Sequence, residues 1–126
     1  MDYPKLYFKK ESFEIIGCAM RVHSELGSGF LESVYQEAFA IELEEIEIPF
    51  EKEKSIPVYY KEKPLRKKFV ADFICHQEII VELKAVESIC EEHTLQVYNY
   101  LNATGCKLGL LINFGSKSLE FRRIVY

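Results

Sequence analysis

The sequence predicts a single α/β domain in which helices flank a mixed central β-sheet. Apolar residues recur with helical spacing between Glu11 and Glu45, and from Phe50 onward the period changes to two. A later helical segment joins the second strand of a predicted hairpin to a strand that is apolar on both sides, which implies a parallel pair of strands. A chain of 126 residues is long enough for one domain with a real core and too short for two.

Two helices are predicted in the N-terminal part. The first spans residues 11–26, with Ser12 as its N-cap and the glycines of 27–29 as its stop. The second begins near Phe30 and ends before Pro49, because the residue before a proline is pushed out of the helical backbone region. Its expected buried side comprises Leu31, Val34, Tyr35, Ala38, Phe39, Ile41 and Leu43. Residues 1–9 are expected to form a short lead-in, partly ordered through Tyr3, Leu6, Tyr7 and Phe8.

The second half of the chain reads mainly as strands. The central feature is a hairpin, FVADFIC and EIIVELKAV, which turns at His76-Gln77 although neither residue is the preferred Gly or Asn. The remaining expected elements are strands at 50–53 and 56–60, a turn at 61–65, a polar connection at 87–92, a helix at 93–103, a buried strand at 107–114 and a last strand at 119–125.

Composition limits the possible functions. Hydrophobic residues make up 48% and charged residues 29%, as in an ordinary globular protein, and the formal net charge is -4. No global basic field attracts nucleic acid, so such binding needs a local patch. No apolar run has the length of a membrane span, and the start of the chain lacks a signal-peptide core, so we expect a cytoplasmic protein with no membrane partner. The four cysteines lack C-x-x-C spacing, which argues against a zinc knuckle or a redox motif.

Three charged residues interrupt the apolar hairpin: Asp72, Glu82 and Lys84, spaced as D-x9-E-x-K. Charges on a strand bound for a core are usually paired or hold a metal. Glu82 and Lys84 share one face of their strand, and a folded hairpin brings Asp72 beside them. Two adjacent carboxylates resist ionising together unless a cation neutralises them, and oxygen ligands suit Mg²⁺ or Mn²⁺. The alternative is a salt-bridged network on a half-exposed strand.

This motif on an antiparallel hairpin, followed by a helix and a parallel strand, resembles the PD-(D/E)xK nuclease superfamily. The segment GFLESVY fits G-x-x-E-x-x-Y and is similar to the GxxExxY group of small bacterial proteins assigned to that superfamily. The segments at 22–27, 82–86 and 108–114 resemble the same group. The resemblance covers most of the chain and implies a restriction-endonuclease-like αβββαβ core in one domain over residues 1–126. One departure is Ala71, which stands where the superfamily has its signature proline.

The resemblance implies roles for individual residues. Asp72, Glu82 and the Leu83 carbonyl are the expected ligands of Mg²⁺ or Mn²⁺, and Lys84 is expected to assist the attacking water. An early helical glutamate is typical of the superfamily, so Glu32 is expected to be a further ligand or a water-orienting group. Without the resemblance, Glu32 would read as an exposed helix residue.

Further residues are expected to contact the substrate. Gln96 and Tyr100 form a Q-x-x-x-Y pair, which resembles a motif that steadies the lysine or the substrate phosphates; the alternative is a solvated Gln96 beside a packing tyrosine. The expected nucleic-acid contacts are Tyr35, Arg66, Lys67, Lys68 and Tyr100. Tyr35 alone would read as a core residue, and the basic run as a solvated turn. Arg122 and Arg123 could add to the basic patch.

Two functions remain open from the sequence. The first is a metal-dependent nuclease that hydrolyses phosphodiester bonds, with DNA favoured over RNA as substrate. The second is a non-catalytic module that keeps the nuclease-like fold and binds a protein or nucleic-acid partner, because a fold alone does not establish activity. A homodimer is compatible with either function.

Overall fold

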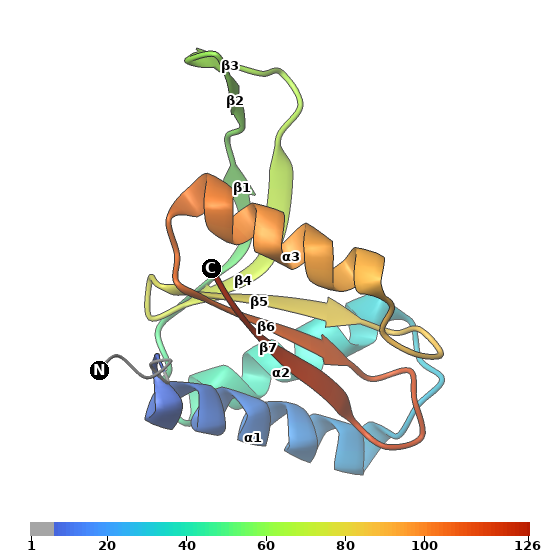
Figure 1. Cartoon of the computed structure of the whole chain (residues 1–126). Coiled ribbons are helices and arrows are strands. Elements are labelled where there is room, and N and C mark those ends of the chain that lie inside the picture. Colours follow the sequence, from blue (N-terminus) through green and yellow to red (C-terminus); the bar gives the residue numbers. More distant parts are fainter. Residues whose placement is uncertain (1–6) are drawn as a thin grey trace, which may run out of the picture.

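A five-stranded mixed sheet forms the centre of the molecule, with helices on both faces (Figure 1). The computed structural model describes residues 7–126, so the expected packing of Tyr3 and Leu6 lies outside the described residues. The sheet has the order β1-β4-β5-β6-β7, in which β5 and β6 are parallel and the other neighbours antiparallel. The elements are α1 (Lys9–Leu26), α2 (Glu32–Glu45), β1 (Phe50–Ile56), β2 (Tyr59–Tyr60), β3 (Lys63–Pro64), β4 (Phe69–Cys75), β5 (Ile79–Lys84), α3 (Glu91–Thr104), β6 (Leu108–Asn113) and β7 (Glu120–Val125). The predicted fold class, including the parallel pair bridged by a helix, is confirmed.

The core has two layers, one on each face of the sheet. Alternate residues of β5 show the division: Val81 and Leu83 pack on the side of α1 and α2, whereas Ile80 packs on the side of α3. Every residue of β6 is buried, which confirms the prediction of a strand covered on both faces. Helix α3, which connects the parallel strands β5 and β6, therefore covers the face of the sheet opposite α1 and α2.

The close approach of α3 to the sheet depends on Gly109 in β6. A Cβ atom at this position would stand 2.5 Å from Val97 Cγ1 and 3.6 Å from the Leu101 methyl carbons. Since Val97 and Leu101 are the fully buried residues of α3, the missing side chain lets the helix settle directly onto the strand.

Helix α1 starts earlier than the sequence predicts. It begins at Lys9, after Phe8 in the left-handed region (φ 55°), and Ser12 lies inside it with its hydroxyl donating to the Lys9 carbonyl at 3.1 Å. The prediction of Ser12 as N-cap was therefore wrong, because the preceding residues already fit a helical turn. The predicted stop is confirmed at Gly27, whose φ is 69°.

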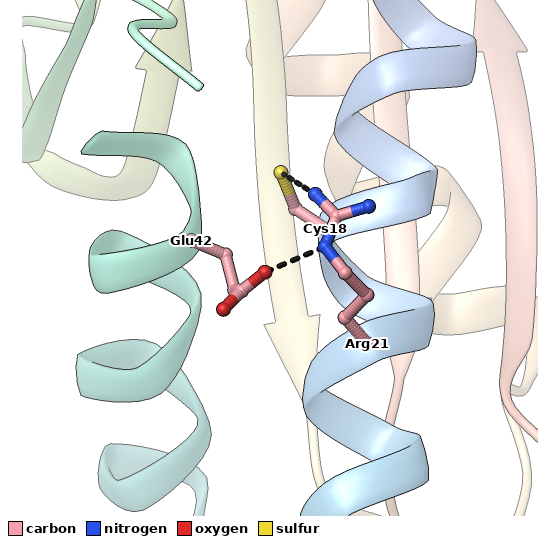
Figure 2. A network of polar contacts seen from close by, with 3 residues as sticks. All are labelled: Cys18, Arg21 and Glu42. Carbon is pink, nitrogen blue, oxygen red and sulfur yellow. Dashed lines mark hydrogen bonds and ion pairs between the residues drawn. The ribbon is translucent and has the colours of Figure 1, made fainter. Parts of the chain in front are cut away.

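A polar contact joins α1 to α2 on the outer side of the helix pair. Figure 2 shows Arg21 between Glu42 and Cys18: its Nε donates to Glu42 Oε1 at 2.6 Å, and its Nη2 approaches Cys18 Sγ at 3.4 Å. Because Arg21 is largely exposed, we expect this ion pair to contribute at most about 1 kcal/mol. Two residues expected on the buried side of α2, Leu31 and Ile41, are instead 76% and 52% exposed, since only the stripe that contains Tyr35, Phe39 and Leu43 faces the sheet.

Beyond the sheet, the chain between β1 and β4 forms a protruding two-stranded ribbon (Figure 1). The ribbon pairs Tyr59 with Pro64 and Tyr60 with Lys63, and it turns at Lys61-Glu62, both in the left-handed region. We call residues 57–68 the arm. Every residue from 61 to 68 is exposed. In the described part of the chain, no helix combines the length and the apolar character that a membrane crossing requires.

Candidate active site

The pairing of β4 with β5 ends just before the predicted motif. The ladder runs from Cys75–Ile79 to Phe73–Val81, and its continuation would place Asp72 opposite Glu82. At this point the side chains of Asp72 and Glu82 accept the hydrogen bonds in place of backbone carbonyls. The Asp72 amide donates to Glu82 Oε2 at 2.6 Å, and the Leu83 amide donates to Asp72 Oδ2 at 2.8 Å. Backbone amides that would face the neighbouring strand thus bind carboxylates.

The strand β4 also changes faces at this point. Ala71 packs in the core on the α3 side, whereas Phe73, two residues later, packs on the side of α1 and α2. Side chains two apart on a regular strand share a face, so the strand is twisted between them. Across from Asp72, the β1 residue Glu53 has φ 54° and forms no ladder pair, although the residues on either side do. The twist leaves Asp72 beside the gap between the strands.

Burial and mutual repulsion set the electrostatics of the two carboxyl groups. Glu82 is only 5% exposed. Burial, followed by the Asp72 charge, raises the pKa of Glu82 to about 8. Burial likewise raises the pKa of Asp72, against the opposing effects of the Leu83 amide and the Lys84 charge. A site that resists holding two negative charges favours a cation nearby.

Lys84 and Glu32 stand within the electrostatic reach of this pair. Lys84 shares a face of β5 with Glu82, as predicted, and its charge lowers the pKa of Asp72, of Glu82 and of Glu32. The pKa of Glu32, in the first turn of α2, is raised by burial and then by Asp72. Within residues 7–126 no salt bridge joins Lys84 to these carboxylates, so the alternative of a salt-bridged network does not describe the site.

The oxygen atoms of the gap suit a hard divalent cation. The C=O of a strand residue leaves on the same side as its N–H, so the Leu83 carbonyl also faces the gap beside Asp72. Two carboxylates and a carbonyl are ligands that Mg²⁺ and Mn²⁺ accept, with water filling the remaining positions. Among the described residues, no three His, Cys, Asp or Glu side chains are gathered as a metal site. The structure therefore does not place Glu32 with Asp72 and Glu82 as a third ligand, and its water-orienting role stays a prediction.

Helix α3 borders the site through Tyr100. The Tyr100 ring stacks on Phe69 with ring centroids 3.6 Å apart and an angle of 3° between the planes. Burial, and then the charges of Glu82 and Asp72, raise the pKa of the Tyr100 hydroxyl, while a hydrogen bond with Gln96 lowers it. Gln96 is exposed one helical turn before Tyr100, so the predicted pair does share a face of α3 near the carboxylates.

Tyr35 is not available to nucleic acid, and its prediction as a contact was wrong. It is fully buried, and its ring stacks on Phe114 with centroids 4.6 Å apart. Its hydroxyl donates to the Gly27 carbonyl at 2.6 Å and accepts from the Phe30 amide at 3.2 Å. The alternative reading, a core tyrosine with its hydroxyl satisfied, is confirmed, because the sheet-facing stripe of α2 includes this position.

The basic residues fall into two separate places. Arg66, Lys67 and Lys68 are exposed in the arm directly before β4. Arg122 and Arg123 lie on β7, at the opposite edge of the sheet, where they donate to Thr94 Oγ1 at 3.1 Å and to the Tyr7 carbonyl, respectively. The expectation that Arg122 and Arg123 extend the arm's patch was therefore wrong, since sheet order is not readable from local sequence.

Two further polar residues support the site and were not predicted. Gln36 follows Glu32 by one helical turn, and its hydrogen bond lowers the pKa of Asp72. Asn113 is fully buried in β6, and its amide donates to the Val86 carbonyl at 2.9 Å while its carbonyl oxygen accepts from the Val86 amide at 2.9 Å. Asn113 thereby fixes the position of the backbone at Val86, two residues after Lys84. Two signals in the sequence could have revealed them. Gln36 follows Glu32 at the helical i, i+4 spacing, and Asn113 is a lone polar residue in an apolar strand.

Comparison with known proteins agrees with this geometry. The family model described as PD-(D/E)XK nuclease superfamily matches residues 9–124. Among solved structures, the crystal structure of SSO0001 is similar in fold, with a TM-score of 0.52 and 18% sequence identity over 90% of this chain. The match spans 65% of that protein's length. No curated protein is significantly similar in sequence. The five-stranded mixed sheet between helices is consistent with a restriction-endonuclease-like fold, and the chain belongs to the PD-(D/E)XK nuclease superfamily.

Proposed function

We propose that this protein is a Mg²⁺- or Mn²⁺-dependent nuclease of the GxxExxY group that hydrolyses phosphodiester bonds, with DNA favoured over RNA. Membership of the superfamily supports a nuclease-type function. The observation that carries the proposal is the gap between β4 and β5, where backbone amides orient Asp72 and Glu82 toward each other beside Lys84. A cytoplasmic location and a possible homodimer are parts of the same proposal.

Each residue of the gap has a role in this reaction. Asp72, Glu82 and the Leu83 carbonyl hold the divalent ion, which polarises the scissile phosphate when bound. Lys84 donates a hydrogen bond to the attacking water or to a phosphate oxygen and offsets the negative charge that develops on phosphorus. Glu32 accepts a hydrogen bond from the water and so orients it.

Residues around the gap hold the substrate. Gln96 and Tyr100 line the α3 side of the carboxylates and steady Lys84 or the substrate phosphates. Arg66, Lys67 and Lys68 neutralise phosphates at the root of the arm, so binding is expected to weaken with salt. These contacts replace the water that would otherwise surround the reacting phosphate.

A cleavage assay with a matched lysine control tests this function. Wild type, Lys84→Ala and Lys107→Ala are incubated with plasmid, linear duplex, single-stranded DNA and RNA, in Mg²⁺, in Mn²⁺ and in EDTA. Lys107 is an exposed lysine just before β6 and serves as the control. We expect metal-dependent cleavage by wild type and Lys107→Ala, and a loss of about 10²-fold or more in Lys84→Ala. Absence of cleavage on every substrate, or full activity in Lys84→Ala, would favour the non-catalytic binding module instead.

A further inference from the structure

The arm carries a charge opposite to that of the rest of the molecule. Five of the chain's 16 lysines and arginines lie in residues 57–68, together with one of its 20 acidic residues. The arm therefore has a formal net charge of +4 and the remainder of the chain -8, which gives the overall -4. Concentration of positive charge on a thin, exposed ribbon creates a local field that attracts a polyanion to this element alone.

Exposed aromatic rings accompany these charges. Tyr59 and Tyr60 are each 62% exposed. They are consecutive residues of β2, so their rings project from opposite faces of the ribbon. Lys61 Nζ stands 5.5 Å from the centroid of the Tyr60 ring, which brings a cation and an aromatic face together at the tip. Neither ring belongs to a core layer, so the Tyr59 ring is free to stack on a ligand.

A hollow of about 320 Å³ lies where the arm meets α3. Its wall is apolar and aromatic, formed by Val58, Leu65, Phe69 and Tyr100, and Lys67 and Lys68 stand at the same hollow. This volume is at the small end of the range for small-molecule sites, which is about 300 to 1,000 Å³. An apolar wall beside two cations suits a flat base attached to a phosphate.

A second hollow continues the first toward the arm. It has a volume of about 460 Å³, shares Val58, Asn99 and Ala103 with the first hollow, and reaches Tyr59. The two hollows therefore form one track that runs from Tyr59 to Tyr100 over the C-terminal half of α3. In Figure 1 this half of α3 passes directly by the root of the arm. At the inner end of the track, Tyr100 stacks on Phe69, which begins the strand that carries Asp72. The charges of Glu82 and Asp72 also raise the pKa of the Tyr100 hydroxyl.

We propose that this track binds a single strand of nucleic acid, with bases stacked on Tyr59 and Tyr100 and phosphates held by Lys67 and Lys68. Successive aromatic rings with interleaved cations are the arrangement by which proteins hold unpaired strands. The bases of a duplex are already stacked on one another and offer no free face to these rings. Binding of a single strand to the track does not depend on the proposed function. Only the statement that this strand is the substrate of the Asp72–Glu82 gap rests on that function.

Binding measured without metal tests the track independently of catalysis. Fluorescence anisotropy in EDTA compares a labelled single strand of about 20 nucleotides with its duplex, at several salt concentrations. The variants are Tyr59→Ala, Tyr59→Phe and Lys67→Gln/Lys68→Gln. The control is Lys9→Gln/Lys10→Gln, an exposed basic pair on α1. The Tyr59→Phe variant keeps the aromatic ring and so separates the loss of stacking from the loss of the hydroxyl.

We expect the single strand to bind more tightly than the duplex, and the alanine variant to weaken its binding about tenfold or more, with affinity retained by the phenylalanine variant. The Lys67→Gln/Lys68→Gln variant should reduce the slope of log affinity against log salt by about 1.4, since each phosphate contact to a single strand contributes about 0.7. Equal or tighter binding of the duplex, or wild-type affinity in the alanine variant, would overturn the proposal. Single-strand binding in EDTA without cleavage in Mg²⁺ would support the track and contradict the proposed nuclease function. Cleavage by wild type, with unaltered binding in the arm variants, would support the nuclease function and contradict the track.

Discussion

The amide of Asp72 donates to Glu82 Oε2 at 2.6 Å, and the amide next to Glu82, that of Leu83, donates to Asp72 Oδ2 at 2.8 Å. Each carboxylate is thus held by the strand that carries the other. These bonds fix the orientation of both groups before any ligand arrives, so a cation that enters the gap meets preplaced oxygen atoms. The same arrangement makes the gap a point of electrostatic strain in the metal-free protein, because both carboxyl groups have raised pKa values.

The strain at Glu82 predicts a pH-dependent stability in EDTA. The pKa of Glu82 is about 8 in the folded protein, whereas the ordinary pKa of a glutamate, which applies to the unfolded chain, is 4.5. Between these values the folded state holds a proton that the unfolded state has lost, so the free energy of unfolding falls as pH rises. Glu82→Gln removes this dependence and should therefore be more stable than wild type at pH about 9. Urea unfolding near pH 6 and pH 9 measures it, with the exposed Glu92→Gln as control. An identical pH dependence in wild type and Glu82→Gln would contradict this account.

The buried hydroxyl of Tyr35 predicts a stability effect without a binding effect. Tyr35→Phe removes the bonds to Gly27 and Phe30, at a cost of about 1 to 3 kcal/mol in the free energy of unfolding. Affinity for nucleic acid in EDTA should be unchanged, because the ring lies wholly inside the core. Chemical unfolding and anisotropy measure the two quantities, and Tyr98→Phe is the exposed control. Weaker nucleic-acid binding by correctly folded Tyr35→Phe would instead support the contact predicted from the sequence.

The two glycines Gly109 and Gly17 should respond oppositely to alanine. At Gly109 the new Cβ meets Val97 Cγ1 at 2.5 Å, so the Val97 side chain or α3 must shift and stability should fall by about 1 to 3 kcal/mol. At Gly17, inside α1, the nearest atom to the Cβ is Arg21 Nη1 at 3.6 Å, and alanine should stabilise the helix by about 0.5 to 1 kcal/mol. Urea unfolding of both variants checks the pair. Equal effects of the same sign would show that α3 does not pack as closely as described.

Asn113 should matter to the position of Lys84 as well as to stability. Asn113→Ala leaves the half-buried amides of Val86 and Gly115 without their acceptor, at a cost of about 1 to 3 kcal/mol. The segment after Lys84 is then free to shift, so under the proposed function kcat should fall more than KM rises. Unfolding and steady-state cleavage rates measure the two effects. Unchanged kcat in a destabilised variant would confine Asn113 to a structural role.

The order of elements and the shared face of Glu82 and Lys84 were predictable because both follow from local periodicity. The turn at His76-Gln77 was also found, although both residues adopt left-handed φ values that usually favour glycine or asparagine. Superfamily membership was predicted from motif order, and the family model confirms it. These predictions needed no knowledge of which elements lie side by side.

The failures share a tertiary origin. Arg122 was expected near the arm, but the order of strands puts β7 at the far edge of the sheet. The change of face at Asp72 coincides with the left-handed backbone of Glu53 on the neighbouring strand, which no period in the sequence reveals. Tyr35 sits in the segment GFLESVY, and its place in that segment does not reveal which side of α2 faces the sheet. Local pattern identifies the element, whereas packing decides which atoms it exposes.

Calorimetric titration of Mg²⁺ and Mn²⁺ tests the central claim most directly. The proteins are wild type, Asp72→Asn and the exposed control Glu91→Gln. Asparagine keeps the shape of Asp72 and an oxygen for the Leu83 amide but removes the charge, so the fold should persist. We predict binding by wild type and Glu91→Gln, and its loss in Asp72→Asn. No binding by wild type at millimolar metal, or equal binding by Asp72→Asn, would contradict the assignment of the gap as a metal-dependent active site.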